Sequence, residues 1–271
     1  MNRGKQWLCA WMVGALLAAP CAGQAEDFAS KLDPELVPAF EQSYVMDLDR
    51  TGPGFLKARA ASLVGSPALP RDASVRVYDR YIPNGDGTGL LRLRIYEPFY
   101  AEGPLPGIYW IHGGGFLYGV PEQNEGQSIR FAKEGGGVVV SVDYRLAPEH
   151  PYPAPLEDCY AGLKWFFAHA GELGVDDSRI AVAGASAGGN LCAAVTLLAR
   201  DRGEFMPCFQ MPLYPMLDDR MSTPSSHEAA DPRVWNTDAN RYGWRAYIGD
   251  IAGTDAVTPY MAPAREQDLS W

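Results

Sequence analysis

Histidine and cysteine are both scarce in this chain, with four and five copies among 271 residues. No histidine and cysteine spacing resembles a metal site, so we expect no bound metal. Basic side chains are also in the minority, 23 against 33 acidic ones, and the net charge of −10 argues against a nucleic-acid partner. The absence of internal repeats and low-complexity tracts excludes repeat architectures.

A hydrophobic run long enough to cross a membrane is missing as well. The apolar run at residues 7–19 follows two basic residues and is too short to span a bilayer comfortably. Small residues follow it as far as Ala25, a layout typical of a secretory signal peptide. We therefore expect residues 1–25 to be a signal peptide, the protein to be exported to the periplasm or the medium, and no stable membrane anchor to remain. Cys21 offers a lipoprotein site as an alternative, although the proline before it fits that poorly.

The rest of the chain, residues 26–271, is long enough for one sizeable core. The chain is 47% hydrophobic, and α/β folds of this length are often one domain. Three cysteines remain in this part: Cys159, Cys192 and Cys208. Because three is an odd number and two of them lie in helix-like apolar segments, we expect buried free thiols rather than a disulfide framework.

The sequence GASAG at residues 184–188 has the form of a nucleophile elbow centred on Ser186. The apolar run at 179–183 predicts a buried parallel strand before it, and apolar residues at helical spacing follow as far as Arg200. Ser186 is therefore predicted at a strand-to-helix turn, where small neighbours are needed and the helix dipole points at the serine. The alternative for this motif alone is a glycine-rich turn that binds nothing, or binds a phosphate.

A second glycine-rich motif, HGGGF at residues 112–116, directly follows the apolar strand predicted over residues 108–111. Loops of this HGGG type supply backbone N–H groups to the oxyanion hole of lipases and esterases. Glycine is needed because the backbone itself must approach the substrate oxygen, and a β-carbon would block it. Two such motifs in this order make a turn without function a minor alternative.

The remaining pattern alternates strands and helices, which indicates a mostly parallel sheet. Further strands are predicted over residues 75–82, 90–96, 138–142 and 211–214. The first two of them are joined by a hairpin turn at residues 83–87. Apolar spacing predicts a helix over residues 156–167, and Thr237 is predicted to cap a later helix.

Together these motifs resemble the hormone-sensitive-lipase-like family of α/β-hydrolase esterases. The resemblance also rests on DYRLAPE at residues 143–149, YP at 214–215, and PYMAPAR with a following DLS between residues 259 and 270. It covers the chain from about residue 33 to its last residue. It implies an α/β-hydrolase fold, a mostly parallel sheet with a helical cap, whose cap segments fall at about residues 28–64 and 218–250.

The resemblance also implies an activity, the hydrolysis of carboxylic esters with short to medium acyl chains, for which no cofactor is needed. Ser186 would be the nucleophile, and the N–H groups of Gly113, Gly114 and Ala187 would stabilise the oxyanion. The family usually has an aspartate before the serine, where this chain has Ala185. That difference spares the nucleophile but removes a local hydrogen-bond partner.

The acid and the histidine of a catalytic triad should follow Ser186 in the chain, but only one histidine does, His227. In the family, the segment resembling residues 265–270 is followed by the strand-loop units that carry the catalytic aspartate and then the histidine. By this resemblance we expect a domain that is incomplete at its carboxyl end, without both triad partners and with impaired catalysis. An uncovered sheet edge also predicts poor solubility or aggregation.

Residues already present offer one way to complete a triad, Asp218 or Asp219 with His227 in the required chain order. Against it, these residues follow a strand end inside the predicted cap, with a proline between them. Structural roles are expected for the other histidines: a loop brace for His112, a turn for His150 and a helix end for His169.

Two alternatives to an esterase stay open. A non-catalytic ligand-binding or interaction module could keep the scaffold and its pocket, and the product of a frameshifted gene would have no role. If the protein is an esterase, its partner is a small-molecule ester.

Overall fold

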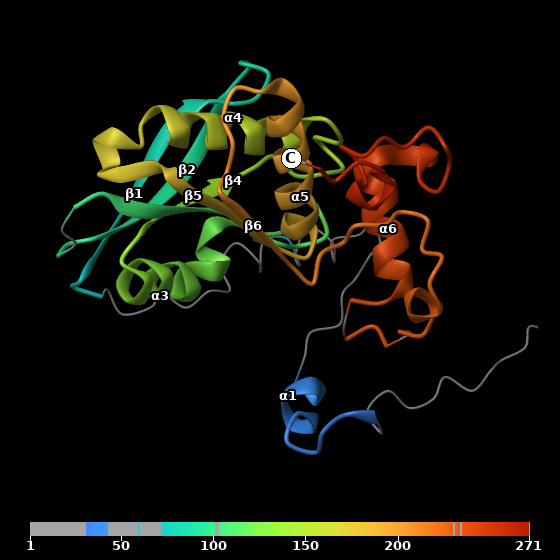
Figure 1. The fold of residues 1–271 in the computed structure, drawn as a ribbon. Helices are drawn as coiled ribbons and strands as arrows, with labels where there is room; N and C mark the ends of the chain where they lie inside the picture. Colours follow the sequence, from blue (N-terminus) through green and yellow to red (C-terminus); the bar gives the residue numbers. More distant parts are fainter. Residues whose placement is uncertain are drawn as a thin grey trace, which may run out of the picture.

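The computed structural model describes residues 31–42, 59, 72–100, 103–229, 231–233 and 235–270 (Figure 1). The predicted signal peptide lies outside this part of the chain, as does most of the first predicted cap segment. Within the described part, six strands form one sheet in the order β1-β2-β4-β3-β5-β6. None of the described helices is both long and apolar enough to cross a membrane.

The first two strands, β1 (Val75–Pro83) and β2 (Leu90–Pro98), pair as the predicted antiparallel hairpin. Its turn is closed by the N–H group of Asn84, which donates to the carbonyl oxygen of Gly89 at 3.0 Å. Strand β2 also pairs antiparallel with β4 (Val138–Asp143). The hairpin therefore extends one side of the parallel part of the sheet.

The other four strands run parallel: β3 (Leu105–Ile111), β4, β5 (Val175–Ala185) and β6 (Phe209–Leu213). In their register, Ile111 at the end of β3 lies beside Gly184 near the end of β5. Both glycine-rich motifs begin at or directly after these two positions. The sheet thus brings the motifs side by side at its carboxyl edge, where open α/β sheets bind their ligands.

Helices cover both faces of the sheet (Figure 1). On one face, α4 (Ala154–Ala168) and α5 (Ala187–Arg202) bury their apolar residues in the larger core, and α4 confirms the predicted helix. On the other face, α3 (Glu125–Gly135) packs against the indole of Trp110. Helix α3 was not predicted from the sequence, because few of its residues are apolar and only two residues of the helix are fully buried.

Helix α6 (Thr237–Ile248) follows the sheet within the second predicted cap segment. The predicted cap residue Thr237 is wrong by one position, since Asn236 is the N-cap and its side chain accepts a hydrogen bond from the N–H of Ala239 at 2.8 Å. The Thr237 hydroxyl donates instead to the carbonyl oxygen of Ser226. Tyr247 of α6 stacks on Phe116, with ring centroids 4.0 Å apart, so the helix is docked on the HGGGF loop.

Short helical segments complete the described elements: α1 (Val37–Glu41), η2 (Pro121–Asn124), η3 (Gly171–Leu173), η4 (Pro224–His227), η5 (Gly249–Ile251) and η6 (Pro263–Arg265). Phe40 of α1 lies under the guanidinium of Arg233 at 4.0 Å. Arg59 donates to the carbonyl oxygens of Leu117 and Ala147. Described parts of the first predicted cap segment therefore touch the second segment and the residue that directly follows the HGGGF loop.

Candidate active site

Ser186 lies at the predicted turn between β5 and α5, with a backbone φ of 57° and ψ of −118°. Such angles are rare for a residue with a side chain and cost on the order of 1–3 kcal/mol. Two hydrogen bonds hold them in place: the N–H of Ser186 donates to the carbonyl oxygen of Leu213 at 3.0 Å, and its own carbonyl oxygen accepts from the N–H of Met216 at 3.1 Å. The end of β6 and the segment after it therefore hold the serine in this conformation.

The elbow admits only small neighbours. A β-carbon on Gly184 would lie 2.2 Å from the carbonyl oxygen of Gly188, and one on Gly188 would lie 2.2 Å from that of Ile111. The turn is thus packed directly against the end of β3, which explains the small residues of the motif.

The HGGGF loop lies against the serine. A β-carbon on Gly113 would come within 2.7 Å of the Ala185 carbonyl oxygen and 3.3 Å of the Ser186 Cβ. Gly114 has a φ of +122° and leaves no room for a β-carbon beside Tyr118. Within the described residues, no hydrogen bond uses the N–H groups of Gly113, Gly114 or Ala187. These donors are therefore available to a ligand oxygen beside Ser186.

His112 supports this loop from inside the protein. Its side chain is fully buried and stacks on Tyr144, with ring centroids 4.3 Å apart. Burial lowers the pKa of the imidazole, so the neutral form is favoured. In the neutral tautomer protonated at Nδ1, that N–H donates to the carbonyl oxygen of Gly113 at 2.8 Å. This contact agrees with the bracing role expected for His112.

The DYRLAPE motif joins three parts of the chain through an ion pair whose carboxylate is buried. Arg145 donates to both carboxylate oxygens of Asp158, at 2.8 and 2.9 Å, and the Asp158 side chain is fully buried. The same carboxylate accepts a hydrogen bond from the N–H of Gly85 in the β1–β2 turn. The hairpin, the loop after β4 and helix α4 are therefore held together at this carboxylate.

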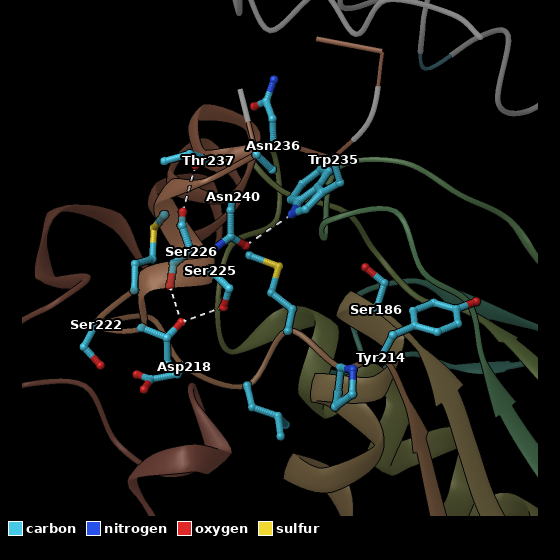
Figure 2. Close-up of a pocket in the computed structure, with 16 residues that line it drawn as sticks. Ser186, Tyr214, Asp218, Ser222, Ser225, Ser226, Trp235, Asn236, Thr237 and Asn240 are labelled. Carbon is cyan, nitrogen blue, oxygen red and sulfur yellow. Dashed lines mark hydrogen bonds between the residues drawn. The ribbon is translucent and has the colours of Figure 1, made fainter. Parts of the chain in front are cut away.

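A pocket of about 300 Å³ opens beside Ser186. Ser186 and Tyr214 lie on one side of it, and Ser225, Ser226 and Asn240 lie across from them (Figure 2). Tyr214 has a φ of 34° and is 78% exposed, so the predicted strand over 211–214 ends one residue early, at Leu213. The pocket thus lies between the sheet edge and the second predicted cap segment.

The structure does not bring the three rescue residues together at Ser186. Asp218 lines the pocket, but it is paired with Arg220 at 2.8 and 3.0 Å, and these hydrogen bonds hold the pKa of its carboxyl below the ordinary value. Asp219 is buried and bound by Arg265 at 2.7 and 2.8 Å. His227 lines a separate hollow with Arg220 and is not among the residues of the Ser186 pocket.

Several residues that line the pocket, above all Trp235 and Asn240, were not predicted as site residues from the sequence. Trp235 lies in a loop and Asn240 in the first turn of α6, and no motif marks either of them as a pocket residue. Within the described part of the chain, no group of three histidine, cysteine, aspartate or glutamate side chains is placed to hold a metal ion.

Comparison with known proteins identifies the family. The model of a family described as having the alpha/beta hydrolase fold matches residues 108–271. Esterase LipI of Mycobacterium tuberculosis is 40% identical over 209 residues, covering 75% of this chain and 63% of LipI. Hormone-sensitive lipase of Bos taurus is 35% identical over 186 residues, covering 68% of this chain and 23% of that protein.

The fold agrees with solved structures. That of a bacterial heroin esterase superposes with a TM-score of 0.83 at 36% identity, covering 90% of this chain and 77% of the other. The chain spans less than two thirds of the length of LipI. From the shared motifs, the fold and these relatives, the chain belongs to the α/β-hydrolase family, among the hormone-sensitive-lipase-like esterases.

Proposed function

We propose that this site hydrolyses carboxylic esters with short to medium acyl chains, with Ser186 as the nucleophile. The observation that carries the proposal is the contact between the strained serine turn and the HGGGF loop, next to N–H groups that no described residue uses. The Ser186 Oγ attacks the ester carbonyl carbon as its proton passes to a base. The N–H groups of Gly113, Gly114 and Ala187 donate to the oxyanion that forms.

The reaction is completed in two halves. Collapse of the tetrahedral intermediate breaks the bond to the alcohol. The alcohol takes up a proton and leaves, and Ser186 remains acylated. Water then attacks the acyl group and releases the carboxylic acid. Helix α5 begins at Ala187, so its amino-terminal dipole also favours the negative charge.

The described part of the chain places no histidine base at this site. None of the described histidines lines the pocket of Ser186. Losing the general base costs a serine hydrolase roughly a millionfold in turnover, while the oxyanion hole and substrate binding still give about a thousandfold over water. We therefore expect residual turnover from residues 1–271 alone.

The test is hydrolysis of p-nitrophenyl butyrate by the purified chain, alongside Ser186→Ala and His227→Ala. Residual turnover that disappears in Ser186→Ala and persists in His227→Ala supports the proposal. Substantial turnover that disappears in both variants would show that His227 reaches the serine in solution. If the unsubstituted chain and His227→Ala are no faster than Ser186→Ala, the esterase proposal for this chain is wrong.

Because no described histidine lines the pocket, we also consider a second candidate, a ligand-binding module on the esterase scaffold. Saturable ester binding with no turnover in the same preparations would support it. Loss of that binding in a variant that fills the pocket, such as Ala229→Trp, would place the ligand beside Ser186.

We also propose that residues 1–25 direct the protein out of the cytoplasm. Expression with and without these residues, followed by fractionation and mass measurement, tests this. A chain that stays in the cytoplasm with residues 1–25 still attached would contradict it.

A further inference from the structure

The wall of the pocket that faces Ser186 carries many polar side chains beside its apolar ones. Among the sixteen lining residues are six aliphatic hydroxyls, two carboxamides and one carboxylate. Most of them belong to the segment between Asp218 and Asn240, across the pocket from Ser186 (Figure 2). Small-molecule pockets are normally lined mainly by apolar side chains with a few polar groups, so this wall departs from the usual pattern.

Part of this hydrogen-bonding capacity is unused. The hydroxyl of Thr223 contacts those of Ser225 and Ser226, at 3.2 and 2.7 Å. Three hydroxyls have three protons and these two contacts use two, so one O–H of the trio remains to donate to a ligand or to water. The hydroxyl of Ser222 has no partner among the described residues. The polar wall can therefore both donate to and accept from a bound molecule.

Asn240 adds an oriented amide to the same wall. Its Oδ1 accepts a hydrogen bond from Trp235 Nε1 at 3.2 Å, which fixes which way the amide points. The two N–H groups of the amide have no partner within the described part of the chain. The Trp235 indole lies beside them, and with Met221 and Ala229 it adds apolar surface to the donors and acceptors of the wall.

We propose that the ester bound here carries hydroxyl groups on the half that enters the pocket, as in a polyol ester or a hydroxy-acid ester. This rests on the proposed esterase function of Ser186. An alkyl chain would displace water from the polar wall without replacing its hydrogen bonds, and that loss weakens binding. A ligand hydroxyl both donates and accepts, so it restores those bonds.

Two matched pairs of esters test the proposal. For the alcohol half, glycerol monobutyrate is compared with propyl butyrate, and for the acyl half p-nitrophenyl 3-hydroxybutyrate is compared with p-nitrophenyl butyrate. Binding is measured by calorimetry on Ser186→Ala, and kcat/KM is measured on the unsubstituted chain. We expect the hydroxylated member of at least one pair to be preferred by about tenfold, since sites that bond a substrate hydroxyl reject analogues lacking it.

Substitutions assign the preference to the polar wall. Asn240→Leu and, separately, the exposed Ser222→Ala should each reduce it severalfold. Asp238→Leu is the matched control, because this side chain lies on the same helix, is 81% exposed and does not line the pocket. It should leave the preference unchanged.

The outcomes separate this proposal from the esterase proposal. Equal affinity within both pairs, tighter binding of the alkyl members, or no binding of any ester would overturn it. A preference that survives both wall substitutions would overturn it too. Hydroxyl-selective binding without turnover removes the esterase proposal for this chain and leaves the selectivity of the pocket standing. Turnover without any preference supports the esterase proposal and overturns the proposed selectivity for hydroxylated esters.

Discussion

At the scale of single residues, the ion pair of Arg145 with Asp158 matters most for stability. Replacing Asp158 with asparagine removes the buried charge of this pair and leaves the partly exposed guanidinium of Arg145 only its contact with Asp86. Breaking a fully buried pair costs about 3–5 kcal/mol, so a value near the lower end, about 3 kcal/mol, applies here. We expect the free energy of unfolding in urea to fall by that amount.

Asp86 provides the control, since it pairs with the same guanidinium but is half exposed. Asp86→Asn should cost clearly less than Asp158→Asn, because solvent screens an exposed pair. If Asp158→Asn were as mild as Asp86→Asn, the buried pair would not hold the hairpin to helix α4.

His112 predicts a pH dependence of stability. Its pKa is lowered in the folded protein, so below pH of about 6.5 the unfolded chain binds more protons than the folded one, and stability falls as the pH falls. The slope from this residue reaches at most about 1.4 kcal/mol per pH unit.

Urea unfolding between pH 7.5 and 5 measures that slope. His112→Gln should flatten it, whereas His150→Gln, at an exposed turn, should not. The carboxyl of Asp231, whose pKa the Arg233 side chain lowers to about 2, contributes only at more acidic pH. An unchanged slope in His112→Gln would contradict the neutral buried imidazole.

At the scale of elements, the amino-terminal cap of α6 holds one wall of the pocket. Asn236→Ala removes the acceptor for the Ala239 N–H and should cost about 1 kcal/mol of stability. Thr237→Ala, at the position wrongly predicted as the cap, keeps that acceptor and should cost less. Thermal unfolding of both variants decides between them.

The elements near the serine were predicted well from the sequence, because strong signals coincide there. Continuous apolar runs predicted β3 and β5, and the small residues of the two motifs predicted the turns that follow these strands. Helix α3 and the α6 cap were missed or misplaced, since few α3 residues are buried and Asn236 and Thr237 both suit a cap. The pocket wall was not predictable, because residues of a long loop and of the first turn of α6 come together there only through the fold.

At the scale of the whole molecule, β6 lies at one edge of the described sheet and exposes apolar groups. Phe209 is 60% exposed, and open edges with apolar side chains promote association between chains. We expect concentration-dependent self-association, visible in sedimentation velocity, that Phe209→Lys reduces.

The opposite edge supplies the comparison. Tyr81 on β1 is 62% exposed, and Tyr81→Lys should change self-association less, since β1 carries charged side chains along its length. A protein that stays monomeric at high concentration would show that the β6 edge is harmless.

At the turn around Ser186, the requirements of activity and of stability are opposed. Glycine tolerates a φ of 57°, so Ser186→Gly should release about 1–3 kcal/mol of strain and lose roughly 0.5–1 kcal/mol to the greater freedom of the unfolded chain. The net result should be a higher Tm than that of Ser186→Ala, which keeps the strain. The residue proposed for the chemistry is then one whose removal makes the protein more robust. Selection for stability alone would discard it.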